Sequence, residues 1–73
     1  MTYQYIAIAE DALDGSWSAY VPDLPGCTGA GATADEALDS VQISIELWIE
    51  EAKLQGLPIP TSRAATRQIA LSA

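Results

Sequence analysis

The sequence predicts an α+β fold with the element order β-β-β-α-β, in which an antiparallel sheet is covered by one long helix. Three observations support this fold class. Residues 3–10 alternate with a period of two, which is typical of a strand with two different faces. A capping motif at Thr33 opens a long amphipathic stretch that ends at Gly56. Between these regions, turn residues separate short runs of apolar residues, as they do in a sheet built from hairpins.

The first two strands are predicted to form a β-hairpin. Within residues 3–10, one face holds Ile6 and Ile8, and the other holds the tyrosines and alanines Tyr3, Tyr5, Ala7 and Ala9. The pair Asp14-Gly15 suits the positive φ angles of a tight turn, and residues 17–21 then resume an aromatic and β-branched run. Such a run is expected for the second strand of a hairpin.

A proline-rich connection ends the second strand. Pro22 and Pro25 cannot donate hydrogen bonds to a sheet, and Gly26 helps the chain to turn. The following residues, 27–32, are small, which favours either a short third strand that another backbone approaches closely or a plain loop. Of the two, we prefer the strand.

A single long helix is predicted to follow. Thr33 is the expected N-cap, Glu36 completes a capping box, and Asp35 and Asp39 suit the positive end of the helix dipole. One apolar stripe should cover the sheet, and it consists of Leu38, Val41, Ile45, Trp48, Ile49 and Ala52.

Three further apolar residues of this helix, Ile43, Leu47 and Leu54, fall outside the stripe. They indicate either a broad core or a contact with another subunit. After the helix, residues 66–71 place Ile69 and Leu71 on one face in alternation, which predicts a final strand.

The size of the chain predicts a single domain, residues 1–73, that associates with copies of itself as a dimer or tetramer. A domain this small buries only ~60% of the surface of its unfolded chain, and its core seldom supplies more than ~3 to 5 kcal/mol. The one cysteine, Cys27, cannot form an internal disulfide, so a neighbouring subunit is the remaining source of stability. The predicted interface residues are Ile43, Leu47, Ile69 and Leu71.

The formal net charge of −7 argues against direct binding to nucleic acid or to a membrane, because an acidic surface is repelled by phosphate groups. The acidic residues serve either solubility alone or the recognition of a basic partner. For a basic partner, the candidate residues are Glu10, Asp11, Asp14, Glu46, Glu50 and Glu51. Since the N-terminus does not have the form of a secretory signal, we expect a cytoplasmic location.

The residue types argue against catalysis. The chain contains no histidine, and Cys27 has no neighbouring cation that would lower its pKa, so a buried structural thiol is expected. The acidic groups are those expected of helix ends and solvated helix faces, and Lys53 lies within reach of Glu46 and Glu50. We therefore predict no catalytic residue, no metal site and no cofactor.

The turn and capping residues carry a resemblance to a known family. They are Pro22, Asp23, Pro25, Gly26, Thr33 and Glu36, followed by the helix exit Gly56-Leu57-Pro58-Ile59-Pro60. In this order, over about residues 3–60, the sequence resembles the HicB-like antitoxin family. The resemblance implies a partial ribonuclease H-like fold. It also implies that the chain neutralises a small basic messenger-RNA-cleaving toxin, HicA, by covering its active site.

Many members of that family carry a second, C-terminal DNA-binding domain. Nothing after the predicted last strand has that form here, so repression of its own operon by this chain is not expected. Two other hypotheses compete with the antitoxin. One is a stand-alone structural or regulatory oligomer without a toxin. The other is a degenerate ribonuclease H-type enzyme, against which residues 3–9 argue because they carry no carboxylate for a pair of metal ions.

Overall fold

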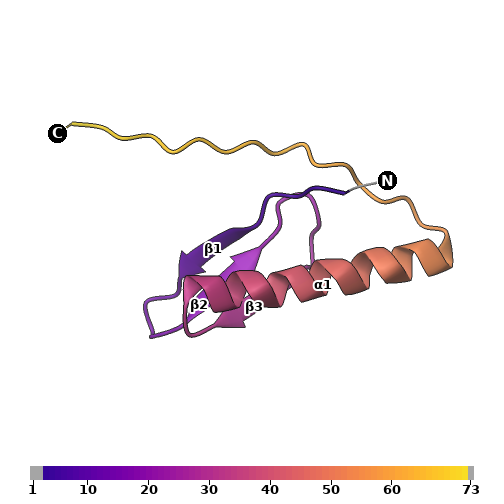
Figure 1. Ribbon diagram of the computed structural model, residues 1–73, viewed down its shortest axis with the longest axis horizontal. Coiled ribbons are helices and arrows are strands. Elements are labelled where there is room, and N and C mark those ends of the chain that lie inside the picture. The colour runs from indigo at the N-terminus through magenta and orange to yellow at the C-terminus, as the bar shows by residue number, and fades with distance from the viewer. Residues whose placement is uncertain (1–2, 73) are drawn as a thin grey trace.

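The computed structural model describes residues 3–72, which form two layers and an extended C-terminal segment (Figure 1). A three-stranded antiparallel sheet, in the order β1-β2-β3, is covered on one face by a single helix. The elements are β1 (Ile8–Asp11), β2 (Trp17–Tyr20), β3 (Thr28–Gly31) and α1 (Ala34–Gln55). The α+β class and the order of the first four elements are confirmed.

The hairpin forms where the sequence predicted it. β1 and β2 pair antiparallel, with Ala9 opposite Ala19, and the Ala12 N–H donates to the Ser16 carbonyl at 3.0 Å to close the turn. Gly15 has a φ of 90°, as predicted, but the other positive φ of the turn, of 65°, belongs to Leu13 and not to Asp14. Residues 3–7 lie outside the ladder, so the strand is shorter than the alternation alone suggests.

Two successive turns make up the connection between β2 and β3. The Leu24 N–H donates to the Val21 carbonyl, and the Cys27 N–H donates to the Leu24 carbonyl, both at 3.1 Å. Gly26 has a φ of 95°, which favours glycine. Between the turns, Leu24 points into the core and is 1% exposed. The Pro-Asp-Leu-Pro-Gly motif therefore folds the chain back and buries one leucine.

The helix backbone lies directly on β3. A Cβ atom at Gly29 would lie 2.6 Å from the carbonyl oxygen of Ala37, and one at Gly31 would lie 2.8 Å from the Ala37 nitrogen. Both distances are shorter than any ordinary contact, so only glycine fits. The prediction of a short strand closely approached by another backbone is confirmed.

Both ends of α1 are capped. Thr33 has an extended backbone, and its Oγ1 accepts the Glu36 N–H at 3.1 Å. Glu36 Oε2 accepts the N–H of Ala32 at 2.7 Å, one residue before the cap, so the box is closed one position earlier than in its usual form. At the other end, Gly56 has a φ of 68° and terminates the helix.

The core lies between α1 and the face of the sheet that carries Tyr5, Ala7 and Ala9. Its buried residues are Ala19, Val21, Leu24, Cys27, Ala37 and Val41. The predicted helix stripe packs here, but its most buried members are small or β-branched, and Ala37, which is fully buried, was missed because alanine is a weak apolar signal. The Cys27 thiol is buried, and burial raises its pKa, as expected of a structural cysteine.

Residues 57–72, here called the C-terminal arm, are extended and leave the body after the helix (Figure 1). The strand predicted at residues 66–71 is not formed within this chain. A strand requires a hydrogen-bonding neighbour, and the arm runs clear of the sheet at these residues.

Candidate partner-binding surfaces

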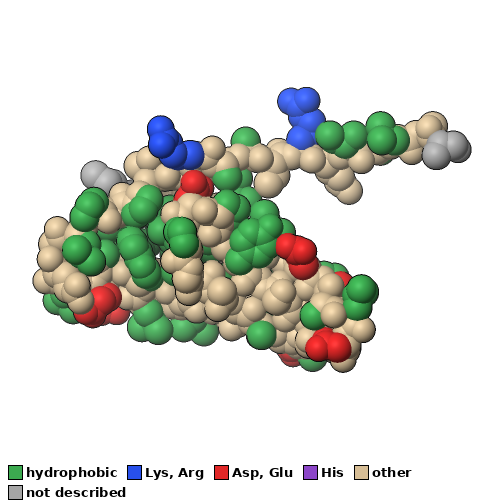
Figure 2. Space-filling model, turned by 180° about the vertical axis from the view of Figure 1, so that it is seen from behind, with side chains coloured by type: hydrophobic (Ala, Val, Ile, Leu, Met, Phe, Trp, Pro, Cys, Tyr) green, Lys and Arg blue, Asp and Glu red, His purple; other side chains and the backbone are tan. Residues whose placement is uncertain are grey.

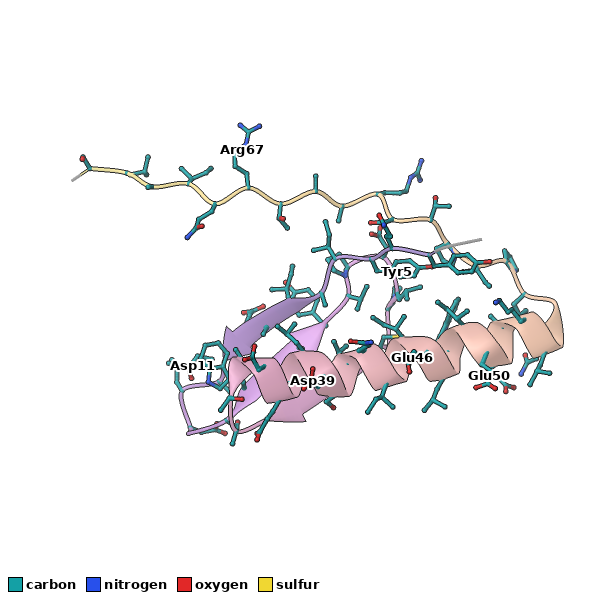
Figure 3. The ribbon with its side chains drawn as sticks, in the orientation of Figure 1. Tyr5, Asp11, Asp39, Glu46, Glu50 and Arg67 are labelled. Atoms are coloured by element: carbon teal, nitrogen blue, oxygen red, sulfur yellow. The ribbon has the colours of Figure 1, made fainter. Side chains whose placement is uncertain are left out.

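The exposed side of α1 combines acidic and apolar side chains. Six of these side chains are spaced three, four or seven residues apart, so they lie on one side of the helix. They are Asp39, Ile43, Glu46, Leu47, Glu50 and Leu54. We call this set the acidic helix face. Ile43, Leu47 and Leu54 are 58%, 62% and 79% exposed. Figure 3 shows Asp39, Glu46 and Glu50 along the same side of the helix.

The structure therefore brings together residues that the sequence assigned to two different partners. Glu46 and Glu50 were predicted to meet a basic partner, and Ile43 and Leu47 were predicted to meet a second copy. All four belong to the acidic helix face. Glu51 is also exposed but lies further round the helix, where its carboxylate accepts a hydrogen bond from the Gln55 amide.

The acidic residues of the hairpin lie elsewhere. Figure 3 places Asp11 at the opposite end of the body from Glu50. Asp11 Oδ1 accepts the Leu13 N–H at 2.8 Å, and Asp14 Oδ1 accepts the Ser16 N–H at 3.0 Å and the Ser16 hydroxyl. The hydrogen bonds from Ser16 lower the pKa of Asp14. These two carboxylates hold the turn, while Glu10 is exposed beside them.

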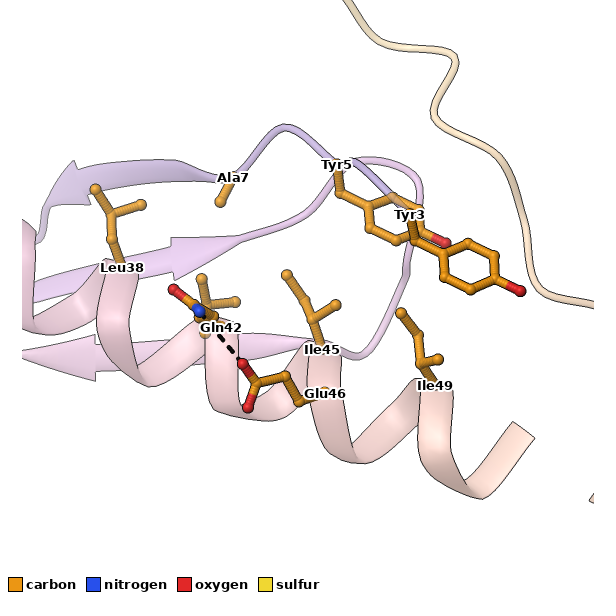
Figure 4. A pocket seen from close by; sticks show the side chains of 9 residues that line it. Tyr3, Tyr5, Ala7, Leu38, Gln42, Ile45, Glu46 and Ile49 are labelled. Atoms are coloured by element: carbon orange, nitrogen blue, oxygen red, sulfur yellow. Dashed lines mark hydrogen bonds between the residues drawn. The ribbon is translucent and has the colours of Figure 1, made fainter. Parts of the chain in front are cut away.

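An apolar groove lies between the N-terminal segment and α1 (Figure 4). Its volume is about 480 Å³, and Tyr3, Tyr5 and Ala7 face Leu38, Ile45 and Ile49 across it, with Gln42 and Glu46 at its rim. The Gln42 amide donates to Glu46 at 3.2 Å. The sequence did not predict this groove, because it arises from the position of α1, which packs mainly over β3 and β2 and less over β1.

Two aromatic side chains at the groove make further contacts. The Tyr5 hydroxyl donates to the Pro60 carbonyl at 2.5 Å, and burial is the main reason that its pKa is raised. The Lys53 ammonium lies 5.5 Å from the ring centroid of Tyr3. The sequence suggested Glu46 and Glu50 as its partners, but in the structure the aromatic ring takes that place through a cation–π contact.

The C-terminal arm is attached to the body near its start. Asp23 Oδ2 accepts the Ser62 hydroxyl at 3.2 Å and the Arg63 N–H at 3.1 Å. Asp23 was predicted only as a turn residue. In the structure it also binds Ser62 and Arg63, which lie 39 and 40 residues further along the chain. In Figure 2 the basic side chains that are visible stand along this arm, above acidic side chains on the body.

Residues 3–72 contain no cluster of three or more His, Cys, Asp or Glu side chains that could hold a metal ion. Over the same residues, no helix has the length and apolar character needed to cross a membrane.

Comparison with known proteins identifies relatives of similar length. The family model of the HicB-like antitoxins of bacterial toxin–antitoxin systems matches residues 5–71. A UPF0150 protein of Synechocystis is 38% identical over 58 residues, which cover 80% of this chain and 73% of that protein. A UPF0150 protein of Thermoplasma acidophilum is 36% identical over 61 residues, which cover 84% of this chain and 88% of that protein. No solved structure matches.

Proposed function

Because the chain belongs to the family of HicB-like antitoxins of bacterial toxin–antitoxin systems, we propose that it binds and neutralises a small, basic, RNA-cleaving toxin of the HicA kind. The acidic helix face makes the main contact, and the bound antitoxin covers the site at which the toxin binds RNA. The proposal rests on one observation above all, which is that exposed apolar side chains and carboxylates alternate along one side of α1.

The charges of this face suit such a partner. RNA is a polyanion, so an enzyme that cleaves it must present cationic side chains around its active site. Asp39, Glu46 and Glu50 can approach those cations and accelerate association by electrostatic steering. Ile43 and Leu47 then supply the apolar contacts that slow dissociation.

The same charges disfavour a second copy of the chain on this face. Two copies that met through Ile43 and Leu47 would place the carboxylates of both helices close together, and like charges at an interface are costly. A basic partner has no such penalty. The acidic helix face is therefore better suited to the toxin than to the self-contact that the sequence suggested for Ile43 and Leu47.

The test is to co-express the chain with a HicA-like protein encoded beside it, to purify the complex, and to measure RNA cleavage. We expect a stable complex without RNA cleavage. The double variant Ile43→Ser/Leu47→Ser should dissociate at least tenfold faster and allow cleavage to return. The control is Leu13→Asn, which removes an exposed leucine from the hairpin turn, outside the acidic helix face.

Three results would contradict the proposal. A folded, active toxin that does not bind the wild-type chain would exclude neutralisation by this chain. If Leu13→Asn lost binding and Ile43→Ser/Leu47→Ser did not, the toxin would bind at the hairpin, where Glu10, Asp11 and Asp14 lie. A complex that still cleaves RNA would show that the contact does not cover the RNA site.

A further inference from the structure

We propose that the C-terminal arm of one copy docks on a second copy as a fourth strand beside β1, with Ile69 and Leu71 in the apolar groove. The exchange is reciprocal, so two copies form a symmetric dimer. This association uses the groove and the edge of β1, which share only Glu46 with the acidic helix face, and it does not depend on the toxin.

The arm is exposed in the single chain although its sequence is suited to burial. Ile69 is 70% exposed and Leu71 is 87% exposed. The radius of gyration is 14.1 Å, whereas about 11 Å is expected for a compact chain of this length. In an extended segment, residues two apart share a face. One face of the arm therefore carries Arg67, Ile69 and Leu71, and the other carries Gln68 and Ala70.

The sheet has one covered edge and one open edge. At β3, the Ser44 hydroxyl donates to the Thr28 carbonyl at 2.8 Å, and the Ala30 N–H donates to the Ser40 hydroxyl at 3.3 Å. Side chains of α1 thus satisfy backbone groups of β3 on its outer side. Among residues 3–72, no backbone hydrogen bond joins the outer edge of β1 to another segment. Such an edge readily accepts an additional strand.

The groove lies beneath that open edge. α1 packs mainly over β3 and β2, which leaves space between the helix and the chain around Ala7 (Figure 4). A strand added beside β1 would direct every second side chain into this space, on the side that faces the helix. The apolar walls suit Ile69 and Leu71, and Glu46 at the rim offers a carboxylate to Arg67.

Charge identifies a second copy as the occupant. All ten acidic residues and Lys53 precede Gly56, so residues 1–56 carry a formal charge of −9, and Arg63 and Arg67 give the remainder +2. The arm is therefore the one basic segment of the sequence, and it is complementary to the body of another copy. Two copies that met through their acidic helix faces would lack this complementarity, because both faces carry carboxylates.

The attachment of the arm favours exchange over closure on its own chain. Its root is held by the hydrogen bond that the Tyr5 hydroxyl donates to the Pro60 carbonyl, and by those that the Asp23 carboxylate accepts from Ser62 and Arg63. Gly56, Pro58 and Pro60 form a short, stiff hinge, and beyond it the arm runs clear of its own β1 (Figure 1). Exchange of identical elements is a common route to dimers, and short hinges promote it.

The experiment is light scattering with size-exclusion chromatography on the full chain without toxin. We expect the wild type to be a dimer at micromolar concentration. Ile69→Asp/Leu71→Asp should be a monomer, with dimerisation at least tenfold weaker. The matched control is Gln68→Asp/Ala70→Asp, which adds the same charge to the opposite face of the arm and should remain a dimer.

Circular dichroism of each variant shows whether the helix is still formed, since the four substituted positions lie outside α1. A monomeric wild type would overturn the proposal. So would a dimer that persists in Ile69→Asp/Leu71→Asp, because the interface would then lie elsewhere. Equal dissociation of both double variants would overturn the face-specific docking. None of these measurements involves the toxin, so they are independent of the proposed neutralisation.

Discussion

Gly29 sets the distance between the sheet and the helix. Its missing side chain lets the backbone of α1 rest on β3, next to the Ala37 carbonyl and the Val41 nitrogen. Both neighbours are backbone atoms, so neither can rotate away from a larger residue. The close approach brings Ala37 and Val41 into the core, where both are 0% exposed.

We therefore predict that Gly29→Ala destabilises the domain by about 1 to 3 kcal/mol or more, because overpacking at a backbone contact forces the helix to shift. The measurement is the free energy of unfolding from urea titration followed by circular dichroism. Ala30→Ser is the control, since Ala30 is exposed on the same strand. Equal stability of both variants and the wild type would contradict the close packing of α1 on β3.

Cys27 connects stability to pH. Burial raises the pKa of its thiol above the ordinary value of 9.0, so folding favours the neutral form. This contribution to stability is complete below the ordinary pKa and is lost as the pH rises through the raised value of the folded state. We expect the free energy of unfolding to fall from about pH 8 to pH 10, and to fall less steeply in Cys27→Ala.

Thiol modification provides a second measurement for Cys27. The folded protein should react slowly with a thiol reagent at neutral pH, and the unfolded protein should react quickly, because the thiolate is the reactive species. Rapid reaction in the folded state would show that the thiol is accessible. An unchanged slope in Cys27→Ala would assign the pH dependence to another group, such as Tyr5, whose pKa burial also raises.

At the scale of the elements, α1 has three functions at once. Its inner stripe covers the sheet, its serines Ser40 and Ser44 satisfy the edge of β3, and its outer side carries the acidic helix face. The arm is the other element with a consequence for binding, and its position depends on Asp23, which lies in the connection between β2 and β3.

We predict that Asp23→Ala loosens the root of the arm. The Arg63 N–H donates to this carboxylate, so its hydrogen exchange should accelerate by about tenfold or more when the acceptor is removed. Amide exchange followed by NMR measures the change at this residue. Asp39→Ala removes the same charge from α1 and should leave the exchange of Arg63 unchanged. A similar acceleration in both variants would indicate a general effect of charge.

At the scale of the whole molecule, charge is segregated along the sequence. The body is strongly acidic and the arm is basic, so the two parts suit different partners. The acidic helix face and the hairpin acids lie at separate places on the body (Figure 3). They contribute together to the long-range field that attracts a cationic protein, although direct contact is proposed only for the helix face.

The association rate with the toxin should therefore decrease by about tenfold or more from low to high ionic strength, because salt screens electrostatic steering. Stopped-flow measurements of the rate over a salt series test this expectation. Glu46→Gln/Glu50→Gln should reduce both the rate and its salt dependence, with dissociation less affected. A rate that does not respond to salt would exclude steering by the acidic body.

The elements that depend on local chemistry could be predicted from the sequence alone. Thr33 and Gly56 define the helix ends through capping, Asp14-Gly15 defines the hairpin turn, and Pro22 to Gly26 define the connection, because each acts on backbone within a few residues. The acidic character of the chain was likewise evident before folding, as was the resemblance that the family match confirms.

How these residues are grouped on the surface depends on the packing of the elements and could not be predicted from the sequence. Periodicity places Ile43 and Glu46 outside the stripe that covers the sheet, but it does not show which surface they share or where the hairpin acids lie relative to them. The groove, the covered edge of β3 and the Asp23 contact with the arm all join segments distant in sequence, so they depend on the packing of α1 on the sheet. The predicted last strand remained unpaired for the same reason, since hydrogen-bonding partners for a strand come from the fold and not from its own residues.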